Sequence, residues 1–483
     1  MIAIIDAIKD LYYEWKGEPA MDVEVLPQSG SDRRYFRVHG SKGTVIGTHG
    51  LNVRENEVFI YFSQHFVSKG LPTAVILAVN DDKTIYLQED FGDASLLNVL
   101  EEEGYTKRSY GLFSESLRQL ANLQVNGHAD LDYEQCLTNT EFGKQAIMAD
   151  LLYFKYYFLD ALRKPYDKQK LIDDFEALSN YLTHTEYKYF MFRDFQSRNI
   201  LLKEDDSVHF IDYQGGMKGA PQYDVASMLW QAKANLPDDW KDNLLNDYMT
   251  TFEEVVGQPI DRSIFHSQYN GYVLIRLLQV LGAYGFRGLF ERKAHFLISI
   301  PMALKNLKGF IASQNVGISV PEFRKVLEAC VSDEIIERFT PLKADDTTEL
   351  VITINSFSYK KGIPQDINGN GGGFVFDCRG ILNPGRFPEY KMYHGKDKEV
   401  KDFLEQQTKM IEFLNSIFDI VDITVEDYIK RNFTSLMVSF GCTGGQHRSV
   451  YAAEALARHL KNKFGVKINI SHVEQEAKDW INQ

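Results

Sequence analysis

Apolar residues recur at helical spacing in the opening stretch MIAIIDAIKDLYYEW, and the period then changes. The runs at residues 33–40, 44–50 and 84–90 are short and rich in β-branched and aromatic residues, which is typical of strands. From about residue 106 the pattern becomes almost wholly helical. Strands followed by helices predict a two-lobed α+β domain.

The stretch FTPLKADDTTEL, residues 339–350, loses apolar periodicity and gathers Pro, Asp and Thr. We place a boundary there, with one domain over residues 1–340 and a second over 348–483. In the second domain strands and helices alternate, which predicts a smaller α/β layered domain with a βαβ unit. The expected strands are 350–357, 374–379, 435–441 and 467–473, and the expected helices are 398–418 and 447–463.

Composition is that of a globular protein, with 44% hydrophobic and 25% charged residues. The four cysteines form no CxxC pair, which favours a reducing compartment and argues against a zinc site. The opening helix does not resemble a secretion signal, and the apolar segment 271–286 is short and contains Arg276, so we expect a cytoplasmic protein without a membrane span.

The net charge of −14 disfavours nonspecific attraction to nucleic acid or anionic lipid. From residue 348 onward there are about 17 basic and about 17 acidic residues, so nearly all the negative charge lies upstream.

The segment FRDFQSRNILLKEDDSVHFIDYQGG carries the strongest chemical signal. Asn199 follows Asp194 by five residues, and Asp212 ends an apolar run. Phosphoryl transfer needs a carboxylate that orients the attacking hydroxyl, and oxygen ligands that hold magnesium against the ATP phosphates. Asp194 fits the first role, and Asn199 and Asp212 fit the second. Either aspartate alone would more simply cap a turn or end a strand, but both at this spacing predict a kinase site.

Four motifs over roughly residues 20 to 300 resemble the aminoglycoside and choline kinase-like phosphotransferases: SGSDRRYFRV, LQEDFGDASL, RDFQSRNILL and IDYQGGMKGAPQYDVASML. Within that family they are most similar to the AmgK-type anomeric kinases of N-acetylmuramate and N-acetylglucosamine. The resemblance implies a protein-kinase-like fold that uses ATP and Mg²⁺ to phosphorylate an amino sugar. It further implies that a turn with Ser31, Arg33 and Arg34 covers the phosphates, and that backbone near Glu89 and Phe91 holds adenine.

The chain departs from the kinase pattern at two positions. Phe192 stands where the catalytic loop commonly has histidine, and the run GTVIGTHG has no lysine to pair with the phosphates. Arg33 or Arg34 is a candidate replacement, the alternative being a solvated surface charge. We interpret Asp224 as a structural residue that orients the catalytic loop.

A second phosphate signature lies in SFGCTGGQHRSV, where an apolar strand, glycines and a helix start follow in order. Backbone N–H groups at a helix start favour an anion, glycines permit close approach, and an arginine can grip two phosphate oxygens. The candidate phosphate-binding residues are Cys442, Thr443, Gly444, Gly445, His447, Arg448 and Ser449. A cysteine five residues before Arg448 is also the spacing of a thiolate phosphatase.

Residues 348–483 resemble the RapZ C-terminal domain in SFSYKKGIPQD, FVFDCRGILNPG, YHGKDKEVKDFL and GCTGGQHRSVYAAEALARHL. The resemblance implies that the loop binds a sugar phosphate or a nucleotide sugar, and so favours a passive cradle over a nucleophile. The near-neutral domain lacks a basic tail, which argues against RNA binding. Two alternatives stay open: a kinase fused to a cysteine phosphatase, and a noncatalytic nucleotide-binding regulator that recruits RNA or protein.

Overall fold

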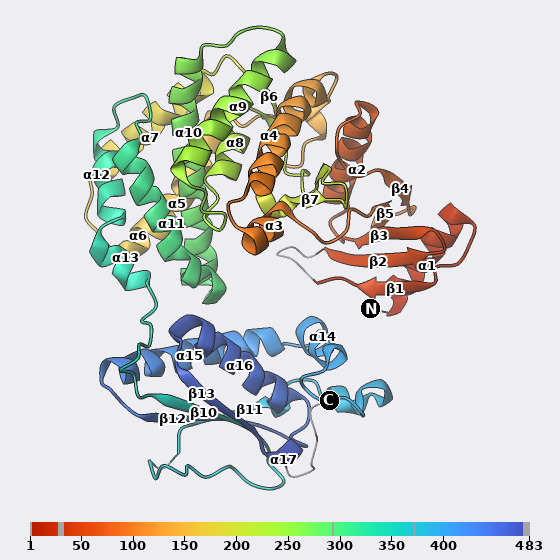
Figure 1. Cartoon of the computed structure of the whole chain (residues 1–483), viewed down its shortest axis with the longest axis vertical. Coiled ribbons are helices and arrows are strands. Elements are labelled where there is room, and N and C mark those ends of the chain that lie inside the picture. Colours follow the sequence, from red (N-terminus) through yellow and green to blue (C-terminus); the bar gives the residue numbers. More distant parts are fainter. Residues whose placement is uncertain (1, 28–32, 292–293, 371, 477–483) are drawn as a thin grey trace. The chain divides into compact units, whose positions relative to one another are not determined.

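A computed structural model describes residues 2–27, 33–291, 294–370 and 372–476 (Figure 1). The chain divides into two compact units. The first comprises Met1–Gly282 and Met302–Val331, and the second Ala283–Pro301 and Ser332–Gln483. The fold class predicted from the sequence is confirmed, with a protein-kinase-like α+β arrangement first and a smaller α/β domain after it.

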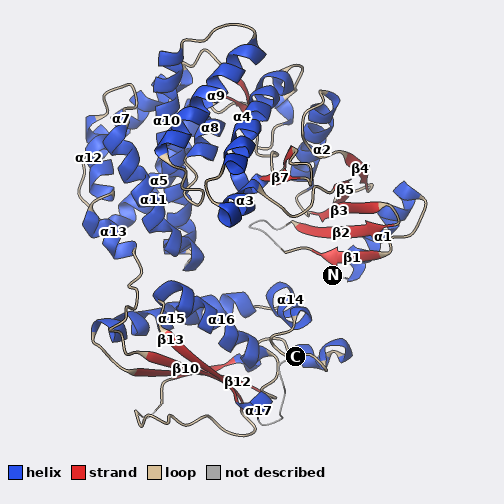
Figure 2. Cartoon of the chain, in the orientation of Figure 1, coloured by secondary structure: helices blue, strands red, loops and turns tan. Residues whose placement is uncertain are grey.

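The first unit begins with an antiparallel sheet of five strands in the order β1-β2-β3-β5-β4 (Figure 2). Helix α1 (Ile2–Lys16) packs its apolar stripe, including Ile8 and Leu11, against Phe36 and Leu87 of the sheet. Helix α2 (Val53–Ser68) follows β3 directly and begins at the cap residue Asn52. The strands are β1 (Asp22–Val25), β2 (Arg34–Gly40), β3 (Gly43–His49), β4 (Ile76–Val79) and β5 (Ile85–Glu89).

The rest of the first unit is mainly helical, as expected. Two short antiparallel strand pairs interrupt the helices and carry the kinase motif: β6 (Tyr189–Met191) pairs with β9 (Met217–Gly219), and β7 (Ile200–Leu202) pairs with β8 (Val208–Phe210). The principal helices are α3 (Leu96–Glu103), α4 (Lys107–His128), α5 (Lys144–Phe154), α7 (Lys168–Thr183), α8 (Gln222–Leu229), α9 (Asp238–Val256), α10 (Arg262–Tyr284) and α12 (Pro321–Cys330).

Helix α10 contains the most apolar stretch of the chain. The segment Arg262–Phe290 is long and apolar enough to cross a membrane by length and composition, but 56% of its most apolar window is buried inside the protein. Leu274, Ile275 and Leu278 are among its fully enclosed side chains. The helix therefore has the burial of a core element.

The second unit contains a parallel sheet in the order β11-β12-β10-β13. Its strands are close to those expected: β10 (Val351–Ser358), β11 (Phe374–Asp377), β12 (Ser435–Cys442) and β13 (Lys467–His472). Because the strands are parallel, their carboxyl ends meet at one edge of the sheet. Ser358, Asp377, Cys442 and His472 all end strands at this edge.

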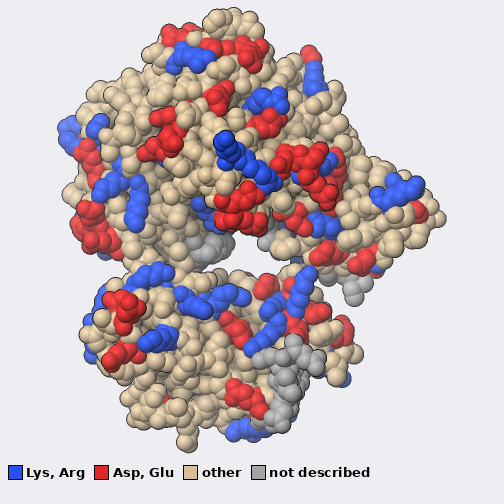
Figure 3. Space-filling view, in the orientation of Figure 1, with Lys and Arg blue, Asp and Glu red and all other residues tan. Residues whose placement is uncertain are grey.

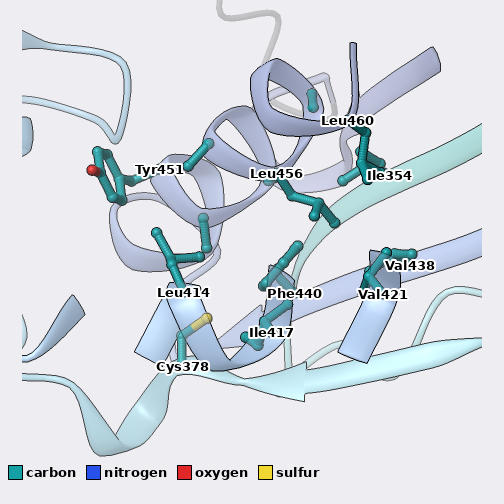
Figure 4. Close-up of a cluster of buried hydrophobic side chains, with 14 of the residues drawn as sticks. Ile354, Cys378, Leu414, Ile417, Val421, Val438, Phe440, Tyr451, Leu456 and Leu460 are labelled. Carbon is teal, nitrogen blue, oxygen red and sulfur yellow. The ribbon is translucent and has the colours of Figure 1, made fainter. Parts of the chain in front are cut away.

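Helices α15 (Met410–Lys430) and α16 (Arg448–Phe464) enclose the core of this unit. In Figure 4, Leu414 and Ile417 of α15 and Leu456 of α16 point toward Val438 and Phe440 of β12. The helix expected over 398–418 is divided into α14 (Lys398–Gln407) and α15, because Thr408 adopts an extended backbone and its hydroxyl accepts from the Met410 N–H.

Charges of both signs mix on the surface. On the face shown in Figure 3, Lys and Arg lie among Asp and Glu in each unit. Many of these charges pair locally, as Arg118 does with Glu115 and Arg431 with Asp427. Exposed pairs of this kind contribute little to stability, so both units depend mainly on their apolar cores.

Candidate functional site

The kinase motif lies on a loop between β6 and β7 that a buried carboxylate holds in shape. Asp224, at the start of α8, accepts hydrogen bonds from the N–H groups of Phe192 (2.8 Å) and Arg193 (2.9 Å). Gln124 donates a third bond of 2.9 Å. Burial is the main cause that raises the pKa of Asp224, to about 7, and these three donors oppose it.

Phe192 fills an apolar position beneath the loop. It is fully buried and meets Phe195, Phe210 and Tyr213 edge-on. An aromatic ring here packs the base of the loop where a histidine would require a hydrogen-bond partner. The replacement of the usual histidine by Phe192 therefore does not remove Asp194 from the loop.

Asp194, Asn199 and Asp212 come together, as their spacing predicts. The Asn199 Nδ2 group donates to the main-chain oxygen of Asp194 (2.9 Å) and to Oδ2 of Asp212 (3.3 Å). Asp212 has a left-handed backbone with φ of 70°. Such a conformation is uncommon for a residue other than glycine, and aspartate is one of the residues that adopt it most readily.

Asp194 is partly exposed, and Arg276 of α10 anchors it. Nη2 of Arg276 lies 3.3 Å from Oδ1 of Asp194, and the arginine side chain is only 6% exposed. Nη1 of Arg276 donates to Gln279 at 2.6 Å, which fixes the guanidinium group. The candidate base is thus held in one orientation while it stays open to solvent.

Gln214 connects the candidate metal ligand to helix α2. Its Nε2 group donates to Oδ1 of Asp212 (2.9 Å) and lies 3.4 Å from Oε1 of Glu55. The same Glu55 oxygen lies 3.2 Å from Nη2 of Arg33, which is buried. Two side-chain amides therefore orient the Asp212 carboxylate: Gln214 bonds to Oδ1 and Asn199 to Oδ2.

A metal ion would find oxygen donors of the required type here. Carboxylate and amide oxygens suit Mg²⁺, which completes its shell with phosphate oxygens and water. Burial, followed by the nearby Asp194 carboxylate, raises the pKa of Asp212, and a bound cation would relieve both effects. Asp212 and Asn199 would be the protein ligands of such an ion.

A cavity of about 480 Å³ opens beside these residues. Glu89 and Phe91, expected near adenine, both line it. Glu89 pairs with Lys203 (2.8 Å), and Phe91 stacks on His209 with ring centroids 4.2 Å apart. These contacts fix the segment that connects β5 to α3.

The arginines of the expected phosphate turn differ in position. Arg33 lines the cavity, whereas Arg34 begins β2 opposite His49 and is not among the lining residues. Ser31 lies outside the described residues. Arg37 also lines the cavity, where it pairs with Asp90 at 2.7 Å.

The second candidate site lies at the carboxyl edge of the parallel sheet. The N–H of Gly445 donates to Sγ of Cys442 at 3.2 Å, and the Ser449 hydroxyl is also 3.2 Å from that sulfur. Thr443 accepts from the Ser358 hydroxyl (2.8 Å) through its main-chain oxygen. The loop therefore folds around a buried thiol.

Glycine is required at two points of this loop. Gly445 has φ of 67°, and a Cβ there would lie 2.3 Å from Cγ of Glu474. A Cβ on Gly441 would collide with the rings of Tyr359 and Phe357. A Cβ added to Gly444 would have no atom within 4 Å, so no contact within the described protein requires a glycine at that position.

Arg448 is buried at the first position of α16. Its Nη1 group donates to the main-chain oxygens of Ile381 (2.7 Å), Arg379 (3.2 Å) and Cys378 (3.4 Å). Its Nε group has no hydrogen-bond partner among the described residues. One side of the guanidinium thus fixes the loop after β11, and the buried Nε donor is left without a partner among the described residues.

His447 and Gln446 hold the loop from its other side. The His447 Nε2 atom is 3.1 Å from the main-chain oxygen of Tyr390, and Gln446 donates to the main-chain oxygens of Lys391 and Tyr393. Burial is the main cause that lowers the pKa of His447. The described contacts of His447 are with the main chain of the loop it holds.

Some residues of these sites were not predicted from the sequence. They are Glu55, Gln214, Arg276 and Glu474. Arg276 offered a signal, since a charged residue in an apolar helix requires a partner. Glu474, next to Gly445, is buried and pairs with Lys361 at 2.9 Å.

Comparison with known proteins identifies both parts of the chain. Residues 22–257 match the phosphotransferase enzyme family, and residues 350–476 match the RapZ C-terminal domain. A nucleotide-binding protein of Clostridium botulinum (strain Okra) is 42% identical over 124 residues, which are 26% of this chain and 40% of that protein. A nucleotide-binding protein of Clostridium kluyveri is 35% identical over 150 residues, 30% of this chain and 49% of that protein. The chain thus spans less than half the length of these relatives.

Solved structures with a similar arrangement include a choline/ethanolamine kinase family protein from Mesorhizobium loti, with 14% identity, a TM-score of 0.44 and coverage of 68% of this chain and 99% of that one. The aminoglycoside phosphotransferase APH(4)-Ia has 15% identity, a TM-score of 0.43 and coverage of 65% and 100%. The assignment rests on the two family matches and not on these structures of low sequence identity. Residues 22–257 form a domain of the phosphotransferase enzyme family, and residues 350–476 form a RapZ C-terminal domain.

Proposed function

We propose that this chain is an ATP-dependent kinase that phosphorylates an amino sugar of the N-acetylmuramate or N-acetylglucosamine class at its anomeric hydroxyl. Its second domain senses a phosphorylated amino sugar. The domains extend over residues 1–340 and 348–483, and the setting is cytoplasmic recycling of cell-wall sugars. All four cysteines are free thiols, which supports a reducing compartment.

One observation carries the kinase assignment. Asn199 bridges the loop of Asp194 to the carboxylate of Asp212, at 2.9 Å and 3.3 Å. This places the candidate base beside the candidate metal ligands, with a cavity of about 480 Å³ next to them. Phosphoryl transfer depends on this kind of positioning more than on covalent chemistry by the protein.

The reaction follows from these positions. The sugar hydroxyl oxygen forms a bond to the γ-phosphorus while the bond from that phosphorus to the β–γ bridging oxygen breaks and ADP leaves. Asp194 accepts the hydroxyl proton, and Arg276 keeps its carboxylate oriented. Asp212 and Asn199 would hold Mg²⁺, which supplies charge neutralisation at the phosphates.

Arg33 takes the place of the lysine that β3 lacks. Its guanidinium lines the nucleotide cavity and is held by Glu55 of α2 through both the side chain and the main-chain oxygen, each at 3.2 Å. An arginine so fixed can contact phosphate oxygens with two donors. The pair Arg33–Glu55 thus corresponds to the lysine–glutamate pair of kinases.

The ion pairs near Asp194 give no support to a cationic acceptor. Arg276 contacts Asp194 directly, and Arg193, the preceding residue, pairs with Asp150 at 2.9 Å. Asp194 and Asp150 are each paired with an arginine, so neither is an unpaired carboxylate that would favour a cationic acceptor such as choline. The choice of an amino sugar rests further on the motifs that resemble AmgK-type kinases.

The loop 442–449 supports the sensor assignment. Glycines, the start of α16 and the buried, unpartnered Nε of Arg448 suit a phosphate. The buried carboxylate of Glu474 next to Gly445 suits the polar groups of the attached sugar. The ligand would be a sugar phosphate or a nucleotide sugar.

One observation favours a second candidate function, a cysteine phosphatase. Sγ of Cys442 receives the Gly445 N–H and lies beside the Ser449 hydroxyl, both at 3.2 Å. Hydrogen bonds of this kind stabilise a thiolate. The cysteine is nonetheless only 3% exposed, which opposes attack on a bound phosphate.

The test is ADP release by the purified full-length protein with ATP, Mg²⁺ and a panel of acceptors. The panel includes N-acetylmuramate, N-acetylglucosamine, glucosamine, choline and an aminoglycoside. We expect release above the acceptor-free rate only with the amino sugars. Release with choline or the aminoglycoside alone would overturn the substrate assignment, and no release with any acceptor would overturn the kinase assignment.

A further inference from the structure

Three arginines line the nucleotide cavity in the described part of the chain, and two are held by acidic residues. Arg33 pairs with Glu55 at 3.2 Å, and Arg37 pairs with Asp90 at 2.7 Å. The third, Arg198, is exposed and forms neither a hydrogen bond nor an ion pair with any described residue. Among the arginines that line the cavity, it is thus the one that no described carboxylate contacts directly.

The backbone around Arg198 is fixed on both sides. Arg198 lies in the short helix η3 (Ser197–Asn199), between two buried neighbours. The N–H and hydroxyl of Ser197 both donate to Oε1 of Gln231, at 3.0 Å and 2.7 Å. The Asn199 amide bonds to Asp194 and to Asp212. Only the side chain of Arg198 is therefore left to move, from a point adjacent to a candidate metal ligand.

This position suits one part of the nucleotide. If Asn199 and Asp212 hold the metal ion, the terminal phosphates of a bound nucleotide would lie next to them, because that ion neutralises those phosphates in kinases. An exposed guanidinium group in the same wall can pair with phosphate oxygens at two points.

We propose that Arg198 is a phosphate-contacting residue that binds the terminal phosphates of the nucleoside triphosphate, together with the fixed Arg33 of the same cavity. The proposal rests on the proposed kinase function. Arg33 is set in place before the nucleotide binds, whereas Arg198 pairs only when the phosphates arrive. The contribution of Arg198 to binding must then increase with the number of phosphates.

The experiment measures this dependence by calorimetry on the full-length protein with Mg²⁺. ATP, ADP and AMP are titrated into the wild type, Arg198→Ala and Arg198→Lys. Arg118→Ala is the matched control, because Arg118 is an exposed arginine of α4 that pairs with Glu115. We expect Arg198→Ala to weaken ATP binding about tenfold or more, to weaken ADP binding less and to leave AMP binding unchanged.

Arg198→Lys should recover part of the loss for ATP, because the charge remains while the fork of donors is lost. Arg118→Ala should bind all three nucleotides as the wild type does. Unchanged ATP binding in Arg198→Ala, or an equal loss for all three nucleotides, would overturn the proposal while leaving the kinase assignment intact. A wild type that binds none of the nucleotides would overturn both.

Discussion

Asn199 and Asp212 lie 13 residues apart in the chain, and Nδ2 of Asn199 is 3.3 Å from Oδ2 of Asp212. The same amide group holds the main-chain oxygen of Asp194 at 2.9 Å. One side chain therefore fixes the distance between the candidate base and the candidate metal ligand. The roles of the two aspartates can be separated by mutation.

Asp194→Ala should lower turnover by roughly 10²–10⁴-fold, the range for loss of a general base, and leave MgATP affinity nearly unchanged. Asp212→Ala should weaken MgATP binding itself, because a metal ligand is lost. Calorimetry and steady-state kinetics on both variants separate the two effects. Full turnover by Asp194→Ala would show that the base is assigned wrongly.

Gln214→Ala should weaken the Mg²⁺-dependent part of nucleotide binding. Gln214 orients Oδ1 of Asp212 at 2.9 Å, and loss of such an outer contact costs roughly 10–100-fold in metal affinity. Calorimetry with ADP, in Mg²⁺ and in EDTA, measures the effect. Gln119→Ala is the control, since Gln119 bonds to Glu115 on α4. Equal losses with and without Mg²⁺ would contradict this role.

The loop 442–449 offers a test between cradle and nucleophile. If the loop only binds, Arg448→Ala should weaken glucosamine-6-phosphate binding by roughly 2–3 kcal/mol. It should also destabilise the domain, because three main-chain oxygens lose the Nη1 donor. Cys442→Ser should change affinity little. Hydrolysis of an aryl phosphate by the wild type that disappears in Cys442→Ser would instead establish the phosphatase.

Glu454 makes the stability of the second domain depend on pH. Its Oε1 atom lies 3.0 Å from Nε2 of His472 and 2.9 Å from Nζ of Lys396. The His472 hydrogen bond, and then that of Lys396, lower the pKa of Glu454 to about 2. A lowered carboxyl pKa stabilises the fold above its ordinary value of about 4.3, and this stabilisation is lost as the pH falls toward 2.

Glu454→Gln should therefore lower the thermal midpoint at pH 7, by an amount corresponding to roughly 1 kcal/mol. The difference from the wild type should shrink between pH 5 and pH 3. Glu412→Gln, at an exposed pair with Lys409, should match the wild type throughout. A difference that stays constant over this range would show that charge on Glu454 is not the cause.

The parts of the sites that are local in sequence could be predicted, and those built by distant residues could not. Asp194, Asn199 and Asp212 lie in one short segment whose spacing reports their chemistry. Glu55 reaches Gln214 across 159 residues, and no pattern near either residue indicates the contact. The sequence likewise offered Arg33 and Arg34 as equal candidates, because only the fold determines which of two neighbours lines the cavity.

The fold of the second domain shows the same division. Its strands and the helix α16 follow the apolar pattern closely. The break between α14 and α15 depends on the hydroxyl of Thr408, which bonds to the main chain at Leu404 and Met410. The sequence around a threonine does not predict such a helix break, because the threonine hydroxyl can bond to the main chain both inside a helix and at its end.

The most direct test of the central claim is phosphorus NMR of the reaction of the full-length protein with ATP, Mg²⁺ and N-acetylglucosamine or N-acetylmuramate. Asp194→Asn is the matched variant, since it keeps the shape of the side chain and removes its capacity to accept a proton. We expect a sugar phosphate signal coupled to the anomeric proton, with equal formation of ADP, in the wild type and none in Asp194→Asn. Absence of any sugar phosphate from the wild type with both sugars, or equal product from Asp194→Asn, would contradict the account.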